Sequence, residues 1–178
     1  MIIMKKNMIL VTLISLIGLL VSGAAYHFTN NQVMFSSAIS FGTILYHFAM
    51  RLAVGYLIDA KYHNQMDYTK KWFQERAFEQ KFYETIKVKK WKKWFPTFNP
   101  QDFQIKSHSV TEIIQVTCQA EIVHEVIMVL SFVPIIFSVW FGSPGVFLLT
   151  SCIAFLFDSI FVIIQRYNRP RLIRLLRK

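Results

Sequence analysis

Charged residues are scarce in this sequence: Asp, Glu, Lys and Arg together make up 17% of its 178 residues, and only ten residues are acidic. A soluble domain usually carries about 25% charged and about 45–50% apolar residues, whereas 54% of this chain is hydrophobic. The apolar residues are gathered in blocks, which is typical of helices that face lipid. The shortage of charge therefore excludes an ordinary soluble domain, and we predict one all-α integral membrane domain over residues 1–178.

Cysteine and sequence repeats are also lacking. The two cysteines, Cys118 and Cys152, lie far apart and form no CxxC motif, so we predict packing roles for them rather than a disulfide or a metal site. The chain has no internal repeat and no low-complexity linker. The missing repeat argues against a transporter built from inverted halves.

The apolar blocks predict four membrane spans, because each block is long enough to cross a bilayer as a helix. The predicted spans are residues 8–26, 34–58, 117–141 and 146–164. We expect Pro134 to kink the third span and residues 141–145 to form a tight turn. The first block also suits a secretory signal, with Ser22-Gly23-Ala24 as its cleavage site, but we expect it to be a retained anchor.

A long polar segment, residues 59–115, separates the second and third spans, and a basic tail, residues 165–178, follows the fourth. Within the polar segment, apolar residues recur at a helical spacing, which predicts an amphipathic helix lying in the membrane interface. These residues are Trp72, Phe73, Phe78, Phe82 and Ile86. Two prolines then predict a loop at residues 96–109.

The positive charge is confined to three segments. Nineteen of the twenty Lys and Arg residues precede the first span, lie in the polar segment or lie in the tail, and Arg51 is the exception. Four spans put all three segments on the same side, so the positive-inside rule predicts a multi-pass protein of the cell membrane with both termini in the cytoplasm. The net charge of +10 then favours anionic lipids as partners over nucleic acid. The sequence predicts no particular protein partner.

Ionisable residues inside apolar spans indicate functional sites, because each costs about 2.5–3.5 kcal/mol to insert. This chain has six such candidates: His47, Arg51, Glu121, His124, Glu125 and Asp158. The rise of a helix, about 1.5 Å per residue, places all six in the cytoplasmic half of the bundle. We therefore expect them to face one cavity.

A histidine that is oriented by a carboxylate can act as a general base for a hydroxyl nucleophile. We predict His124 as this base, with Glu121 or Glu125 as its partner, and His47 as a further catalytic candidate. Arg51 or Arg166 would hold a phosphate, a CoA group or an oxyanion. Three structural alternatives stay open: polar residues that only hold the bundle together, an Arg51–Asp158 ion pair, and a membrane-surface belt around Trp91.

A metal site is a lesser alternative. The spacing of Glu121 and His124 is the Glu-x-x-His spacing of di-iron helical bundles, which use the motif twice, but this chain has it once in a predicted span. His27, His63 and His108 are too scattered to complete a cluster. We therefore predict neither a metal nor another cofactor.

Three stretches of the second half resemble the glycosyl-4,4'-diaponeurosporenoate acyltransferase family. The tail run at residues 165–172 is similar to the family's C-terminal signature, and Ala120-Glu121-Ile122-Val123-His124 is similar to its AELxH segment. A basic-aromatic element is matched by Val88, Lys90, Trp91 and Lys92. The three stretches occur in the family's order, and the resemblance is strongest near the end of the chain.

This resemblance implies a membrane enzyme that esterifies a sugar hydroxyl of a glycosylated carotenoid, or another lipid-linked sugar, with a fatty acyl chain from acyl-CoA or a phospholipid. The implied catalytic residues are Glu121 and His124, with Arg166 and Arg169 as a clamp for the donor and Asn168 as a donor to the carbonyl oxygen. We also expect Gln165, Arg171 and Trp91 to bind substrate. The alternatives are a small non-enzymatic assembly subunit of the membrane and a metal-dependent lipid-modifying enzyme.

Overall fold

The computed structural model describes residues 2–95, 100–104 and 106–176, and every regular element in them is a helix. The elements in chain order are α1 (Ile2–Thr29), α2 (Gln32–Tyr62), η1 (Lys71–Phe73), α3 (Glu79–Thr85), α4 (Val88–Trp91), η2 (Lys92–Trp94), η3 (Pro100–Phe103), α5 (Val110–Leu130), α6 (Pro134–Phe141) and α7 (Pro144–Leu176). The all-α fold class is therefore confirmed.

Four helical stretches are long and apolar enough to cross a membrane, as the sequence predicts. They are Met4–Thr29, Gln32–Tyr62, Val110–Phe141 and Pro144–Leu176. Each helix extends beyond the apolar block from which its span was predicted. The basic tail in particular continues α7 as far as Leu176, so its arginines up to Arg174 belong to that helix.

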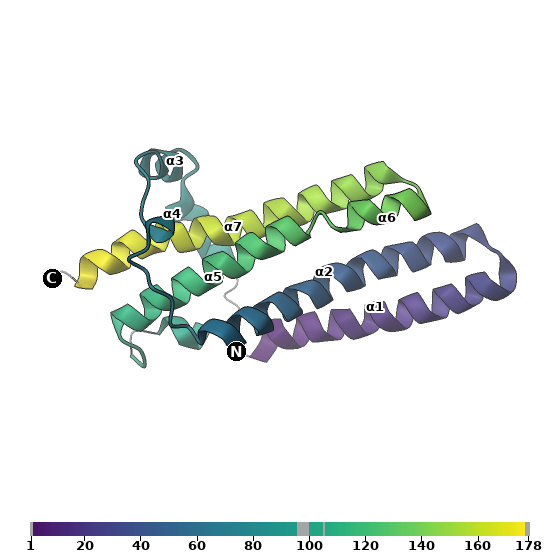
Figure 1. Cartoon of the computed structure of the whole chain (residues 1–178), viewed down its shortest axis with the longest axis horizontal. Coiled ribbons are helices and arrows are strands. Elements are labelled where there is room, and N and C mark those ends of the chain that lie inside the picture. Colours follow the sequence, from purple (N-terminus) through teal and green to yellow (C-terminus); the bar gives the residue numbers. More distant parts are fainter. Residues whose placement is uncertain (1, 96–99, 105, 177–178) are drawn as a thin grey trace.

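The four stretches form two antiparallel hairpins that lie side by side (Figure 1). Helix α1 packs chiefly against α2, while α5 and α6 pack against α7, and α2 joins the two hairpins through α5. Both termini and the polar segment lie at the same end of the bundle, so the three basic segments also gather there (Figure 1).

Local chemistry sets the ends of these helices. Asn30 adopts a left-handed conformation (φ 51°), and the Asn31 side chain caps α2 by accepting from the Val33 amide at 2.8 Å. A capping box of Ser109 and Glu112 starts α5. At Pro134, where the sequence predicts a kink, the helix is interrupted: α5 ends at Leu130 and α6 begins at Pro134. The turn after α6 uses Gly142 at φ 73°, which a residue without Cβ adopts freely.

The polar segment differs from the prediction of one amphipathic helix. Its residues form several short helices, and the apolar side chains do not share a face. Phe73 is buried in a cluster with Met66 and Cys118, whereas Phe78 and Phe82 are exposed. Of the loop predicted at 96–109, residues 96–99 and 105 lie outside the described residues, and η3 occupies part of the remainder.

Helix α1 meets α2 closely at one glycine. A Cβ atom on Gly18 would lie 2.6 Å from Cδ1 of Phe41, well inside van der Waals contact. Most other large side chains of α1, such as Leu13, Ile17 and Leu20, are exposed and would face lipid. The packing of α1 therefore depends on this close approach.

We expect Gly18→Val to destabilise the α1–α2 hairpin by about 1–3 kcal/mol, the usual cost of overpacking. The measurement is the thermal aggregation midpoint of the purified protein in detergent. Gly23→Val is the matched control, because a Cβ on Gly23 meets nothing within 4 Å. Equal midpoints for the two variants would show that Gly18 is not a packing contact.

Candidate active site

An inner polar layer lies where α2, α5 and α7 meet, and the Asp158 carboxylate of α7 is its centre. One oxygen of Asp158 forms an ion pair with Arg51 of α2, and the other lies 3.0 Å from Nδ1 of His124 on α5. The side chain of Asp158 is only 2% exposed. A single carboxylate thus ties together three helices and both hairpins.

The charges of this layer balance. A buried carboxylate without a partner is very costly in an apolar environment, and Arg51 supplies the opposite charge to Asp158. Arg51 also donates to the backbone carbonyl of His47, one turn away, at 2.9 Å. The opposite charges of Arg51 and Asp158 therefore balance within the layer.

The imidazole of His124 is held in one orientation. Its ring stacks on Phe161 with centroids 4.7 Å apart and planes inclined by 11°. Its side chain is 21% exposed, against 2% for Asp158, so the imidazole is accessible from outside the bundle and its carboxylate partner is not. Among the described residues, only Nδ1 of His124 makes a hydrogen bond.

His47 lies in the same region with its hydrogen-bonding capacity unused. Its side chain is buried, and neither ring nitrogen has a hydrogen-bond partner among the described residues. Buried polar atoms of this kind are rare in folded proteins and call for an explanation. A bound substrate would supply one.

An outer polar layer lies nearer the termini and centres on Glu121 of α5, which is fully buried and one turn from His124 along that helix. Nη1 of Arg166 donates to one of its oxygens at 2.6 Å, and Arg169 pairs with the other. Both arginines come from α7. The outer layer therefore couples α5 to α7, as Asp158 does farther in.

The same two arginines fasten the polar segment to the bundle. Arg166 also binds the Glu79 carboxylate at 2.8 Å and the backbone carbonyls of Trp72 and Gln74, each at 3.0 Å. Arg169 donates to the carbonyl of Phe73 at 3.1 Å. A guanidinium has five donors in a fixed fork, so each arginine can serve a carboxylate and loop carbonyls at once.

These contacts correct the predicted partner of His124. Glu121 is occupied by the two arginines, and Glu125 accepts from the indole N–H of Trp72 at 3.0 Å. Asp158, which the sequence suggested only as the partner of Arg51, orients the imidazole. The predicted Arg51–Asp158 ion pair is confirmed.

The predicted roles of several tail residues also change. Arg169 is 1% exposed, and the donors of Arg166 and Arg169 are occupied by protein groups, so neither is a free clamp for the acyl donor. The side-chain amide oxygen Oδ1 of Asn168 accepts from Nζ of Lys92 at 2.6 Å. Asn168 lies ten residues from Asp158, about 15 Å along the helix, so it is too distant to act on the carbonyl that His124 would serve.

Of the three other predicted substrate-binding residues, two have polar contacts within the protein. The indole of Trp91 donates to the carbonyl of Ile86 at 2.8 Å. Arg171 lies over the Tyr167 ring, 3.5 Å from its centroid. Gln165 is buried, and its side-chain oxygen has no partner among the described residues. Of the three, only Gln165 keeps an unused polar atom inside the bundle.

The stretches that carry the family resemblance pack together. Val88 and Tyr83 form a buried cluster with Tyr167 of α7, and Lys92 lies over the Tyr167 ring at 4.8 Å. Burial and the nearby Arg171 charge lower the pKa of Lys92. Together with the Glu121 contacts, this packing unites segments that lie far apart in the sequence.

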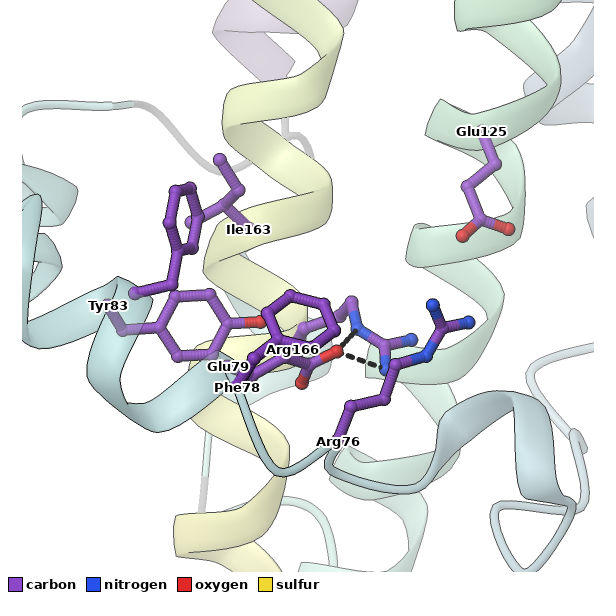
Figure 2. A pocket seen from close by; sticks show the side chains of 8 residues that line it. Arg76, Phe78, Glu79, Tyr83, Glu125, Ile163 and Arg166 are labelled. Carbon is purple, nitrogen blue, oxygen red and sulfur yellow. Dashed lines mark hydrogen bonds and ion pairs between the residues drawn. The ribbon is translucent and has the colours of Figure 1, made fainter.

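A cleft of about 240 Å³ opens beside the outer layer, and Figure 2 shows Glu79 and Arg166 joined at its centre. It is lined by residues of α3, α5, α7 and the segment just before α3: Arg76, Phe78, Glu79, Phe82, Tyr83, Glu125, Ile163 and Arg166. Burial, and then the Glu79 charge, raise the pKa of Tyr83, so its phenol stays protonated. Sequence reasoning missed Glu79, because nothing in its local pattern distinguishes it from the exposed charges around it.

Acidic and histidine side chains do not form a metal cage in the described ranges. No group of three or more His, Cys, Asp or Glu side chains converges there. Glu121 and His124, the residues with the di-iron spacing, have separate protein partners.

Replacing Arg169 by lysine keeps a positive charge beside Glu121 but should destabilise the protein by about 1–3 kcal/mol, the cost of leaving buried hydrogen-bonding groups without a partner. A lysine ammonium cannot reproduce the fork that serves Glu121, Thr117 and Phe73 together. Unfolding in a mild detergent measures this loss. The matched control is Arg174→Lys, because Arg174 is exposed on the same helix. An unchanged midpoint for Arg169→Lys would contradict the role of the outer layer.

Comparison with known proteins gives one match. The family model described as glycosyl-4,4'-diaponeurosporenoate acyltransferase matches residues 69–178. This range includes α3, α5 and α7. It also includes the residues of both polar layers apart from His47 and Arg51, which belong to α2. No curated protein and no solved structure matches the chain.

Proposed function

Because the chain belongs to the glycosyl-4,4'-diaponeurosporenoate acyltransferase family, and is thus a membrane acyltransferase, we propose that His124 is its general base. In this proposal the enzyme moves a fatty acyl group from acyl-CoA or a phospholipid to a hydroxyl of a lipid-linked sugar, such as a glycosylated carotenoid. The observation that carries the proposal is the 3.0 Å contact between His124 and Asp158. Family membership also removes the reason to retain a non-enzymatic subunit.

Nε2 of His124 would take the proton of the sugar hydroxyl while its oxygen attacks the carbonyl carbon of the acyl donor. The resulting tetrahedral intermediate collapses to the new ester. The leaving group, the thiolate of CoA or the alkoxide of a lysophospholipid, then recovers the proton from His124. Asp158 would stabilise the imidazolium in between, as the carboxylate does in a Ser-His-Asp triad.

The balanced charge of the inner layer supports this mechanism. Arg51 and Asp158 neutralise each other in the ground state. Proton transfer creates a positive imidazolium and a negative oxyanion together, so the net charge of the site does not change. Fixed partners for developing charge are most effective where water is excluded. The N–H of His47, which has no partner among the described residues, is our candidate donor to the oxyanion.

The environment of His124 suits a donor with a fatty chain. Large apolar side chains near it on α7, such as Leu156 and Phe157, are exposed and would contact lipid, so an acyl chain could approach along this surface. The anionic part of the donor would bind lysines at the basic end of the bundle. Lys89, Lys90 and Lys93 are exposed there and form no ion pair with any described residue.

We predict that His124→Gln lowers the rate of acyl transfer by about 10²–10⁴-fold, the usual contribution of a general base. The assay uses membranes supplied with labelled acyl-CoA and a glycosylated carotenoid, with protein quantified by immunoblot. The matched control is His27→Gln, because His27 is an exposed histidine at the opposite end of the bundle. Transfer at the parent rate by folded His124→Gln would disprove the catalytic role.

We also propose that both termini lie in the cytoplasm and that the protein resides in the cell membrane. The clustering of the basic segments at one end of the bundle supports this orientation (Figure 1). A membrane-impermeant thiol reagent applied to intact cells should label a Ser143→Cys variant and leave an Arg174→Cys variant unlabelled. The reverse labelling pattern would show that both termini lie outside the cell.

A further inference from the structure

The cleft beside the outer layer has a composition that the acyl-transfer mechanism does not use. Its lining includes two exposed aromatic rings, Phe78 at 62% and Phe82 at 42% exposure. It also includes the carboxylates of Glu79 and Glu125. The hydroxyl of Tyr83 points toward Phe78 and the Glu79–Arg166 pair (Figure 2).

Glu79 has an unused acceptor at this cleft. It is only 4% exposed, and its Oε1 accepts from Arg166. Its Oε2 is buried without a hydrogen-bond partner among the described residues. A buried carboxylate oxygen left in this state is costly, so a hydroxyl donor bound in the cleft would be stabilised by it.

The lining does not select for an anion. It contains two arginines, Arg76 and Arg166, and their charges are balanced by the carboxylates of Glu79 and Glu125. The donors of Arg166 already bind Glu79, Glu121 and two backbone carbonyls. A neutral molecule with several hydroxyl groups and an apolar C–H face suits this lining. Its hydroxyls can donate to the carboxylates, and its C–H groups can pack on the electron-rich faces of the aromatic rings.

We propose that this cleft binds the sugar ring of the acceptor, an inference that rests on the proposed function. The ring would lie against Phe78 and Phe82, with a hydroxyl donating to Glu79. The volume of about 240 Å³ is below the range of about 300–1,000 Å³ for sites that take drug-sized ligands, which suits a single ring.

The position of the cleft agrees with this role. Glu125, which lines it, follows His124 directly in α5. Ile163, also in the lining, lies five residues from Asp158, about 7.5 Å along α7. A sugar ring held here would be next to the catalytic pair, toward the polar end of the bundle, while its lipid part extends into the membrane.

The test uses methyl β-D-glucoside as a soluble probe and the full chain in nanodiscs, with binding measured by saturation-transfer difference NMR. The parent and the inactive His124→Gln variant should both bind the probe. Phe82→Ala should weaken binding by about 2- to 10-fold, the range expected from loss of one aromatic contact. Glu79→Gln should weaken it as well. If that variant misfolds through loss of the Arg166 pair, Phe82→Ala decides, because its side chain is exposed.

Trp94→Ala is the matched control, because Trp94 is an exposed aromatic of the same segment that does not line the cleft. Binding that is absent in the parent, weakened equally by Trp94→Ala, or displaced by inorganic phosphate would overturn the proposal. In the acyl-transfer assay, Phe82→Ala should raise KM for the glycosylated acceptor and leave KM for the donor unchanged. Sugar binding without acyl transfer by the parent would refute the proposed function but not the sugar site.

Discussion

The buried carboxylate of Asp158 is the constraint on which the rest of the bundle depends. A charge this deep in an apolar assembly needs an opposite charge and hydrogen bonds close by. Arg51 of the first hairpin supplies the charge, and His124 of the second supplies a ring nitrogen. The requirement fixes how the two hairpins meet, and in doing so it fixes the orientation of the imidazole. The Asp158 side chain therefore serves both the packing of the hairpins and the proposed chemistry.

The outer layer repeats this arrangement with a different result. Glu121 satisfies Arg166 and Arg169 of α7, and the remaining donors of the two arginines reach the carbonyls of Trp72, Phe73 and Gln74. Without these donors, the irregular backbone of the polar segment would have no hydrogen-bond partners where it packs against the apolar bundle. The arginines thus hold the polar segment in place, and α3 comes to rest beside α5 and α7. The cleft exists because of that docking.

The two layers separate tasks that a small membrane acyltransferase has to combine. In the inner layer Arg51 and Asp158 carry opposite charges, and the imidazole of His124 is partly exposed, so in the proposed mechanism an acyl chain could reach it. The outer layer is close to the polar end of the bundle, where a sugar and a donor headgroup would remain hydrated. A ligand that spans both layers would place a hydroxyl next to an acyl carbonyl without exposing the carboxylate of Asp158 to water. This division is the basis of both proposals.

The sequence by itself determined the membrane class, the four spans, the break at Pro134 and the gathering of basic segments at one end, because hydropathy and charge are properties of local stretches of chain. It also identified Glu121, His124 and Asp158 as candidates, since any ionisable group in an apolar block stands out. Only the tertiary structure decided their pairing. His124 and Glu121 share a face of α5, but the register of α7 places Asp158 opposite the first and two arginines opposite the second. That register depends on the rotation and contact of whole helices, which the spacing of residues within one helix does not specify.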